Sequence, residues 1–233
     1  LLRRHDYMFS VDIADAYHHI GFHDDDVHFF TFGLELMDGV RFFNTPVLNF
    51  GFTNSPAIFT EVMAAVVSHL RHPAHSAHHR SYGVVKSHMN APQGIHVLPW
   101  IDDFLFITDG RLGYEHAVQM RDAVHSLFAS LHVTLNDKGV FDPTHVMEKH
   151  LGFTIDAERA LFLLTPTRVH AITHGAHRLL QAQRRVQARQ LASFCGLCEA
   201  SGLALPLARF HLRELYDDLK QMQHWAATIT LSK

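Results

Sequence analysis

The feature that most constrains the fold is the stretch LPWIDDFLFITDG, residues 98–110, in which two adjacent acids interrupt an apolar run. An ionised carboxylate is costly to bury, so Asp102 and Asp103 are not expected inside a core. A tight turn between two strands removes the conflict, because the apolar residues can pack while both acids lie at the exposed end. The stretch therefore predicts two short strands over 95–108 with the acids at their junction.

The composition fits one large globular domain or two small ones. The 233 residues are 47% hydrophobic and 18% charged, which excludes a disordered chain and allows a sizeable core. No apolar run reaches the roughly 18 residues that a membrane span needs. The first nine residues, LLRRHDYMF, lack the apolar core of a secretory signal. We therefore expect an intracellular protein of the cytoplasm or nucleus that does not contact membranes.

Hydrophobic periodicity and turn signals predict alternating strands and helices. The expected elements are a strand over 7–12, a hairpin over 27–47 with its turn at Asp38-Gly39, a helix over 54–72, the two strands of 95–108, a helix over 113–133, a hairpin over 150–165, and helices over 166–182 and 187–205. This order favours an α+β fold in which helices back an antiparallel sheet, followed by a helical region. The predicted domains are 1–165 and 166–233.

A third acid, Asp12, also ends a predicted strand. Carboxylate oxygens are the ligands that Mg²⁺ prefers, and two such ions about 4 Å apart support phosphoryl transfer. Two acids hold two dications poorly, so we expect the carboxylates of Asp12 and Asp102 to lie roughly 4–6 Å apart, with Asp109 outside the cluster. Asp15 is a weaker candidate. Taken alone, Asp12 fits the cap of a following short helix equally well.

Charge is unevenly distributed along the chain. Residues 1–156 carry ten Lys+Arg and eighteen Asp+Glu, a net charge of −8, whereas residues 157–213 carry eight Arg and two Glu, a net charge of +6. An acidic body followed by a basic arm suggests metal chemistry in one part and phosphate contact in the other. An ordinary solvated helix face explains the basic arm without any ligand.

The cysteines and histidines give weaker signals. Cys195 and Cys198 form a CxxC, which is typical of half a zinc site or a redox pair. No second such pair stands nearby, so we expect two reduced, half-buried thiols on a helix. The densest histidine cluster, HPAHSAHHR at 72–80, favours a solvated polar loop over a metal site.

The acids belong to a longer ordered pattern that resembles the palm of a reverse transcriptase. Five stretches over about residues 7–165 resemble that family's motifs in the family's order: FSVDIADAYHHI, PVLNFGFTNSPAIFTEVM, PWIDDFLF, TLNDKGVF and KHLGFTID. The details DAYHHI, WIDDFL and LASFCGLCEASGLALPLARFHLREL look most like retroelements of the DIRS type. The resemblance implies an RNA-directed DNA polymerase with a palm over 1–165 and a helical, thumb-like region over 166–233.

The resemblance assigns the catalytic acids by position. Asp12 and Asp102 would be the principal ligands of two Mg²⁺ ions, with Mn²⁺ as a substitute, and the carbonyl of Ile13 would add a contact. Asp103 would be the second acid of the pair, beside the primer end, and would also contact the metal ions. Lys138 would either protonate the pyrophosphate leaving group or stabilise it electrostatically, although a lysine in a loop is otherwise simply solvated.

The resemblance also assigns residues that bind the nucleotide and the nucleic acid. Tyr17 would exclude a 2′-hydroxyl, and Phe50 and Gly51 would lie over the incoming nucleotide and the template base. The primer grip would consist of Leu151, Gly152 and Phe153. The arginines that contact the nucleic-acid backbone would be Arg178, Arg184, Arg185 and Arg189. The implied partners are an RNA template, a DNA primer and dNTPs.

Some positions depart from the family's pattern. Trp100 stands where Tyr is usual, and Asn49 where Pro is common. The chain also begins almost on the first motif, so we expect truncated fingers and a longer polyprotein that supplies fingers and ribonuclease H regions. The alternatives are an inactive polymerase-like module that binds RNA/DNA hybrid and, less favoured, another metal-dependent enzyme such as a nucleotide cyclase.

Overall fold

The structure is a computed structural model that describes residues 2–71, 95–182 and 184–232. The chain divides into two compact units, Leu1–His145 and Val146–Lys233. The division therefore falls about twenty residues before the boundary expected from the sequence, and the strands after His145 group with the helices that follow them. The histidine cluster at 72–80 lies outside the described residues.

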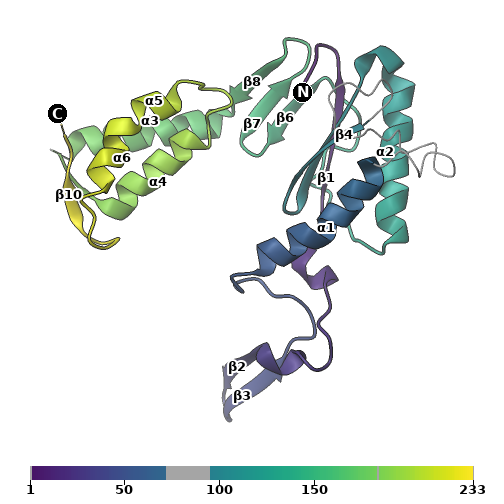
Figure 1. The fold of residues 1–233 in the computed structure, drawn as a ribbon, viewed down its shortest axis with the longest axis horizontal. Helices are drawn as coiled ribbons and strands as arrows, with labels where there is room; N and C mark the ends of the chain where they lie inside the picture. Colours follow the sequence, from purple (N-terminus) through teal and green to yellow (C-terminus); the bar gives the residue numbers. More distant parts are fainter. Residues whose placement is uncertain (1, 72–94, 183, 233) are drawn as a thin grey trace. The chain divides into compact units, whose positions relative to one another are not determined.

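The first unit is built on an antiparallel sheet of three strands (Figure 1). The central strand β5 (Asp103–Thr108) pairs with β1 (Tyr7–Asp12) on one side and with β4 (Ile95–Trp100) on the other. Phe9 and Phe106 face each other in the β1–β5 register, and their rings stack with centroids 4.9 Å apart. Both are fully buried, so the strands carry the core and the predicted pair of strands is confirmed.

Two long helices cover this sheet. Helix α1 (Ser55–Arg71) buries Phe59, Met63, Val67 and Leu70, a spacing of three to four residues that gives one apolar stripe. Helix α2 (Gly113–Ser130) presents a similar stripe that includes Phe128, whose ring meets Phe104 edge-on. These side chains join the strands in one hydrophobic core.

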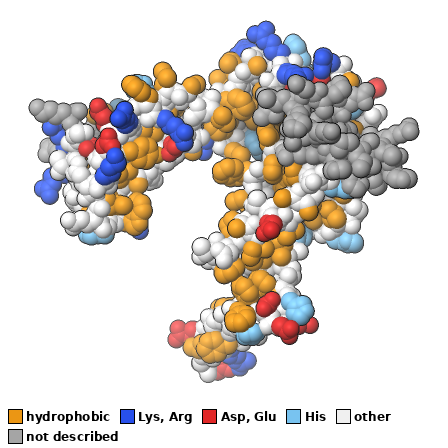
Figure 2. Space-filling view, in the orientation of Figure 1, with side chains coloured by type: hydrophobic (Ala, Val, Ile, Leu, Met, Phe, Trp, Pro, Cys, Tyr) orange, Lys and Arg blue, Asp and Glu red, His pale blue; other side chains and the backbone are white. Residues whose placement is uncertain are grey.

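The predicted hairpin forms with its turn at the expected place. Strands β2 (Thr31–Leu36) and β3 (Gly39–Asn44) pair in register, and Gly39 takes a φ of 124°, which favours glycine. Two short 3₁₀ helices, η1 (Ala16–His19) and η2 (Val27–Phe29), precede the hairpin along the chain. A third, η5 (Gly110–Leu112), precedes α2. Every residue of the two strands is exposed, and Figure 2 shows hydrophobic side chains on this hairpin.

The free edge of β1 is covered by residues 134–144. Main-chain hydrogen bonds join this segment to β1 and its continuation at the pairs Ala14–Thr134, Asp12–Asn136, Ser10–Val140 and Met8–Thr144. An uncovered strand edge would offer unpaired N–H and C=O groups to other chains. The segment therefore completes the pairing of β1 as a fourth strand would.

The second unit combines a small sheet with helices. Strands β6 (Val146–His150), β7 (Phe153–Asp156) and β8 (Leu161–Leu164) form an antiparallel sheet, where the sequence predicted only a hairpin. The helices are α3 (Pro166–Gln181), α4 (Ala188–Glu199), α5 (Ala208–His211) and α6 (Arg213–Leu219). Strands β9 (Arg185–Gln187) and β10 (Thr228–Thr230) pair antiparallel. Helix α3 begins as expected, since Thr165 Oγ1 accepts the Arg168 N–H and Pro166 follows it.

One predicted helix was too long. The helix expected over 187–205 ends at Glu199, and the Ser201 hydroxyl donates to the Leu197 carbonyl at the point where the chain turns. Gly202 and Pro206 follow, and neither favours continuing a helix.

The two cysteines lie on helix α4 without a disulfide, as expected, but they are buried and not half-buried. Cys195 and Cys198 are free and buried in the core of the second unit. Burial raises the pKa of the Cys195 thiol to about 11, and it also raises the pKa of Cys198. Such thiols are protonated at neutral pH and react slowly.

Among the described residues, no helix is long and apolar enough to cross a membrane.

Candidate active site

Three acids meet at one end of the first unit's sheet. A two-residue turn, Ile101–Asp102, joins β4 to β5, and Asp103 is the first residue of β5. Asp12, the last residue of β1, is the direct partner of Asp103 across the strands. Directly opposite residues have Cβ atoms about 4.5–5.5 Å apart. The Ile13 N–H donates to the Asp102 carbonyl at 2.9 Å, which fixes the turn against β1.

The turn itself is strained. Ile101 has a φ of 57°, in the left-handed region that β-branched residues rarely adopt. Such a conformation costs roughly 1–3 kcal/mol and persists only where the surrounding structure enforces it. Here the pairing of β4 with β5 and the bond from Ile13 to Asp102 supply that enforcement.

Burial and the two neighbouring acids make Asp103 harder to ionise. Partial burial raises the pKa of Asp103 above its ordinary value, and the negative charges of Asp12 and Asp102 raise it further. Asp109 behaves oppositely at the far end of β5. Hydrogen bonds from Arg111 lower its pKa to about 2, with Arg3 also nearby. Asp109 therefore stands apart from the cluster, as predicted, and the excess negative charge gathers where Asp12 and Asp103 face each other.

This donor set fits a hard divalent cation. Within the parts of the chain that the structure describes, no group of three or more His, Cys, Asp or Glu side chains forms a cage that could hold a metal ion. Mg²⁺ does not need such a cage, because it is commonly held by one or two carboxylates together with water and substrate phosphates. Asp12, Asp102 and Asp103 supply oxygen ligands and a local excess of negative charge. The predicted separation of the Asp12 and Asp102 carboxylates stays a prediction.

Asn136 contacts the catalytic candidate Asp12 directly. Its side-chain Nδ2 donates to Asp12 Oδ2 at 2.8 Å, and its backbone N–H donates to the Asp12 carbonyl at 2.8 Å. Lys138 lies two residues on and is exposed. Its role at the leaving group stays a prediction.

Two of the three predicted nucleotide-binding residues touch. The Tyr17 ring is 8% exposed and lies 4.7 Å from the Phe50 ring and 5.7 Å from the Phe59 ring, measured between centroids. Phe50 is 63% exposed, so it forms an accessible edge next to a firmly packed tyrosine. Gly51 follows with a φ of 91°, a conformation that side chains other than glycine rarely adopt. These contacts suit a floor for a sugar, but the assigned roles stay predictions.

The predicted primer-grip residues form the turn between β6 and β7 in the second unit. Leu151 and Gly152 both have positive φ, 50° and 83°, and Phe153 is buried at the start of β7. Arg168 of α3 lies over the Phe153 ring, 5.3 Å from its centroid. A Cβ at Gly152 would come within 2.4 Å of the Arg168 guanidinium carbon, so glycine allows this arginine to lie against the turn.

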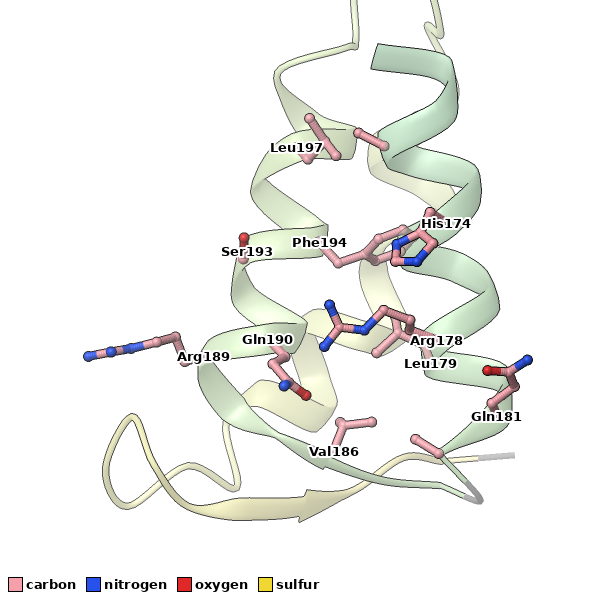
Figure 3. Close-up of a pocket in the computed structure, with 13 residues that line it drawn as sticks. His174, Arg178, Leu179, Gln181, Val186, Arg189, Gln190, Ser193, Phe194 and Leu197 are labelled. Carbon is pink, nitrogen blue, oxygen red and sulfur yellow. The ribbon is translucent and has the colours of Figure 1, made fainter. Parts of the chain in front are cut away.

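Two of the four predicted backbone-binding arginines line a groove of about 710 Å³ between α3 and α4. Figure 3 shows Arg178 pointing from α3 towards α4, near Gln190, while Arg189 extends away from α3. Arg184 and Arg185 are exposed at the start of β9. The groove is therefore polar and positively charged at one end, and contact with nucleic acid stays a prediction.

A comparison with models of known protein families identifies the family of the chain. A family model described as reverse transcriptase (RNA-dependent DNA polymerase) matches residues 1–140. The chain belongs to the reverse transcriptase family. The matched span contains Asp12, the Asp102-Asp103 pair, Tyr17 and Lys138. The match does not test the resemblance to DIRS-type elements, which stays a prediction.

Solved reverse transcriptase structures share the fold. The structure of the foamy viral protease-reverse transcriptase dRH in complex with double-stranded DNA matches 100% of this chain and 33% of that chain, with a TM-score of 0.62 and 18% identity. The same viral protein in complex with RNA/DNA hybrid matches 100% of this chain and 26% of that chain, with a TM-score of 0.58 and 16% identity. The chain thus spans about a third or less of these relatives. A search of curated proteins found no match.

Sequence reasoning missed two contacts, one in each unit, with residues that it had assigned a role. Asn136 lies in the stretch TLNDKGVF, two residues before Lys138, and this proximity was the available signal. Arg168 was counted only as part of the basic arm. Its position two residues after Pro166, at a helix start, gave no indication that it would lie on the turn at Gly152.

Proposed function

We propose that the chain is the palm and thumb portion of an RNA-directed DNA polymerase that adds dNTPs to a primer 3′-hydroxyl by phosphoryl transfer. The observation that carries the proposal is the direct pairing of Asp12 with Asp103 across β1 and β5, with Asp102 in the adjoining turn. Membership of the reverse transcriptase family over residues 1–140 supports this reading of the acids.

The acids give the chain its role in the chemistry. Asp12 and Asp102 would hold two Mg²⁺ ions, with Mn²⁺ as a substitute and the Ile13 carbonyl as a further ligand, and Asp103 would lie beside the primer end. Two ions held there would supply a lower pKa for the primer hydroxyl and positive charge for the triphosphate. Lys138 would offset charge on the leaving pyrophosphate from its exposed loop.

The contacts of Tyr17 support selection of deoxynucleotides. Its ring is held between Phe50 and Phe59, so it has little freedom to move aside for a 2′-hydroxyl. Phe50 and Gly51 would lie against the incoming nucleotide and the template base.

The second unit would hold the template and primer. Its arginines would contact phosphates without reading sequence, since backbone contacts position a duplex and do not specify it. Leu151, Gly152 and Phe153 would support the primer end, with Arg168 lying against their turn. Fingers and ribonuclease H regions would come from a longer polyprotein of a retroelement, most like the DIRS type.

Primer extension tests this proposal. On a poly(rA)·oligo(dT) template with Mg²⁺ or Mn²⁺, the chain should incorporate dTTP, and Asp102→Ala with Asp103→Ala should abolish incorporation. The matched control is Asp137→Ala, which removes an exposed acid near Lys138. Extension by the double variant equal to that of the unchanged chain would show that the acids are wrongly assigned.

A second candidate is a polymerase-like module that binds RNA/DNA hybrid without catalysis. The exposed arginines at the start of β9, Arg184 and Arg185, support this alternative, because they can contact phosphates without any catalytic step. It predicts hybrid binding that weakens with salt and no nucleotide incorporation. Charge reversal at Arg184, Arg185 and Arg189 should then weaken binding, and unchanged binding would count against the module.

A further inference from the structure

We propose that Asn136 is a positioning residue that holds one oxygen of the Asp12 carboxylate and so keeps a space for a divalent cation between Asp12 and Asp103. The inference rests on the proposed function and adds a residue that the family's assigned acids do not include.

Asn136 grips Asp12 by both its backbone and its side chain. The backbone N–H donates to the Asp12 carbonyl at 2.8 Å, and Nδ2 donates to the Asp12 carboxylate at 2.8 Å. The first bond sets the distance between the two backbones, and the second sets the direction of the carboxylate. Because both bonds come from one residue, the carboxylate cannot rotate without losing the amide contact.

The segment that carries Asn136 is fixed on both sides. Ala14 donates its N–H to the Thr134 carbonyl at 2.9 Å, and Ser10 donates its N–H to the Val140 carbonyl at 2.9 Å. The Ser10 hydroxyl also accepts the Val140 N–H at 2.8 Å. A Cβ at Gly139 would lie 2.6 Å from the Ser10 carbonyl oxygen, so the two backbones are in close contact. Asn136 is therefore held in place before any ion binds.

Asp12 lies between Asp103 and Asn136. On one edge of β1 it faces Asp103, and on the other edge it faces Asn136. The two acids repel each other, and a free Asp12 side chain has several rotamers that would place its oxygens away from Asp103. The amide selects one of these positions and leaves the second carboxylate oxygen for a cation.

An amide suits this task better than a charged donor. Asn carries no charge, so it orients the carboxylate without neutralising the negative field that attracts a cation. A Lys or Arg at the same position would form an ion pair and compete with the metal. Groups that orient a metal ligand typically change metal affinity by about 10–100-fold when they are removed.

Binding of Mn²⁺ to the chain without nucleotide, followed by electron paramagnetic resonance, tests the proposal. We expect Asn136→Ala to weaken Mn²⁺ binding by about 10–100-fold, and Asn136→Leu, which keeps the approximate volume, to do the same. The matched control is Thr134→Ala, because Thr134 contacts β1 through its carbonyl. It should bind Mn²⁺ as the unchanged chain does.

The decisive comparison uses Asp12→Ala alone and together with Asn136→Ala. If Asn136 acts through Asp12, the double variant should bind Mn²⁺ no more weakly than Asp12→Ala. If Asn136→Ala weakens Mn²⁺ binding by the same factor in the Asp12→Ala background as in the unchanged chain, the positioning role is overturned. Unchanged Mn²⁺ binding by both Asn136 variants would overturn it as well. If Asp12→Ala itself binds Mn²⁺ normally, the proposed active site fails instead, so the two failures are distinguishable.

Discussion

Neutralising Asp103 should make the metal-free protein more stable. Asp103 lies opposite Asp12, and at about 5 Å their repulsion is about 1 kcal/mol in water and about 3 kcal/mol at an effective dielectric constant near 20. Asp103→Asn removes this repulsion and the cost of partly burying the charge. We therefore expect the free energy of unfolding to rise by about 1–3 kcal/mol at pH 7, which is a shift in melting temperature of about 2–12 °C.

The sign of the pH dependence follows from the raised pKa of Asp103. The folded protein takes up this proton more readily than the unfolded chain, so the ionised acid destabilises the fold. The gain from Asp103→Asn should be complete above the folded pKa and should vanish below the unfolded value of 3.8. Adding Mg²⁺ should stabilise the unchanged chain more than the variant, because only a folded site binds the ion.

Thermal unfolding in EDTA, followed by circular dichroism at pH 7 and at a pH below 3.8, measures these effects. Asp109→Asn is the matched control at the other end of β5. Its pKa is lowered to about 2, chiefly by hydrogen bonds from Arg111, so its charge stabilises the fold above its unfolded pKa. After allowance for solvent screening, this variant should lose about 1 kcal/mol. If Asp103→Asn melts at or below the unchanged chain in EDTA at pH 7, the reasoning about crowded acids is wrong.

Three other results are expected. Gly152→Ala should cost about 1–2 kcal/mol in urea denaturation, because φ is 83° and the new Cβ displaces the Arg168 guanidinium; an unchanged midpoint would contradict this. Cys195 should resist iodoacetamide at pH 8 until urea unfolds the chain, because burial raises its pKa to about 11. Labelling of Cys195 in the folded protein would contradict this expectation. Tyr17→Ala should raise the ratio of ribonucleotide to deoxynucleotide kcat/KM by about 10–100-fold, and an unchanged ratio would exclude Tyr17 as the sugar-selecting residue.

The sequence predicted the local elements of the first unit well, because their signals are local. Alternation in 95–108, the Asp38-Gly39 turn and the apolar stripe of α1 each lie within a few residues of chain. The paired position of Asp12 and Asp103 depends on a contact between residues about ninety positions apart. Periodicity alone did not predict that these two acids would lie close together. That prediction came from the resemblance to the motifs of a known family.

Long-range pairing also explains what was missed. Strands β9 and β10 are three residues each and lie about forty residues apart, so neither has a periodic signal of its own. The contact of Asn136 with Asp12 likewise depends on residues 134–144 lying along β1. A single Asn in a loop gives no indication of which strand it will meet.

The register of β1 and β5 restricts which substitutions the core between them can accept. Phe9 pairs with Phe106, and three residues along the same two strands Asp12 pairs with Asp103. A shift of one residue would separate the stacked rings and turn the side chains of one strand to the other face. Substitutions at two buried phenylalanines can therefore change which residues face each other at the acid end of the sheet. Variation in this core is limited by the alignment of Asp12 with Asp103 as well as by packing.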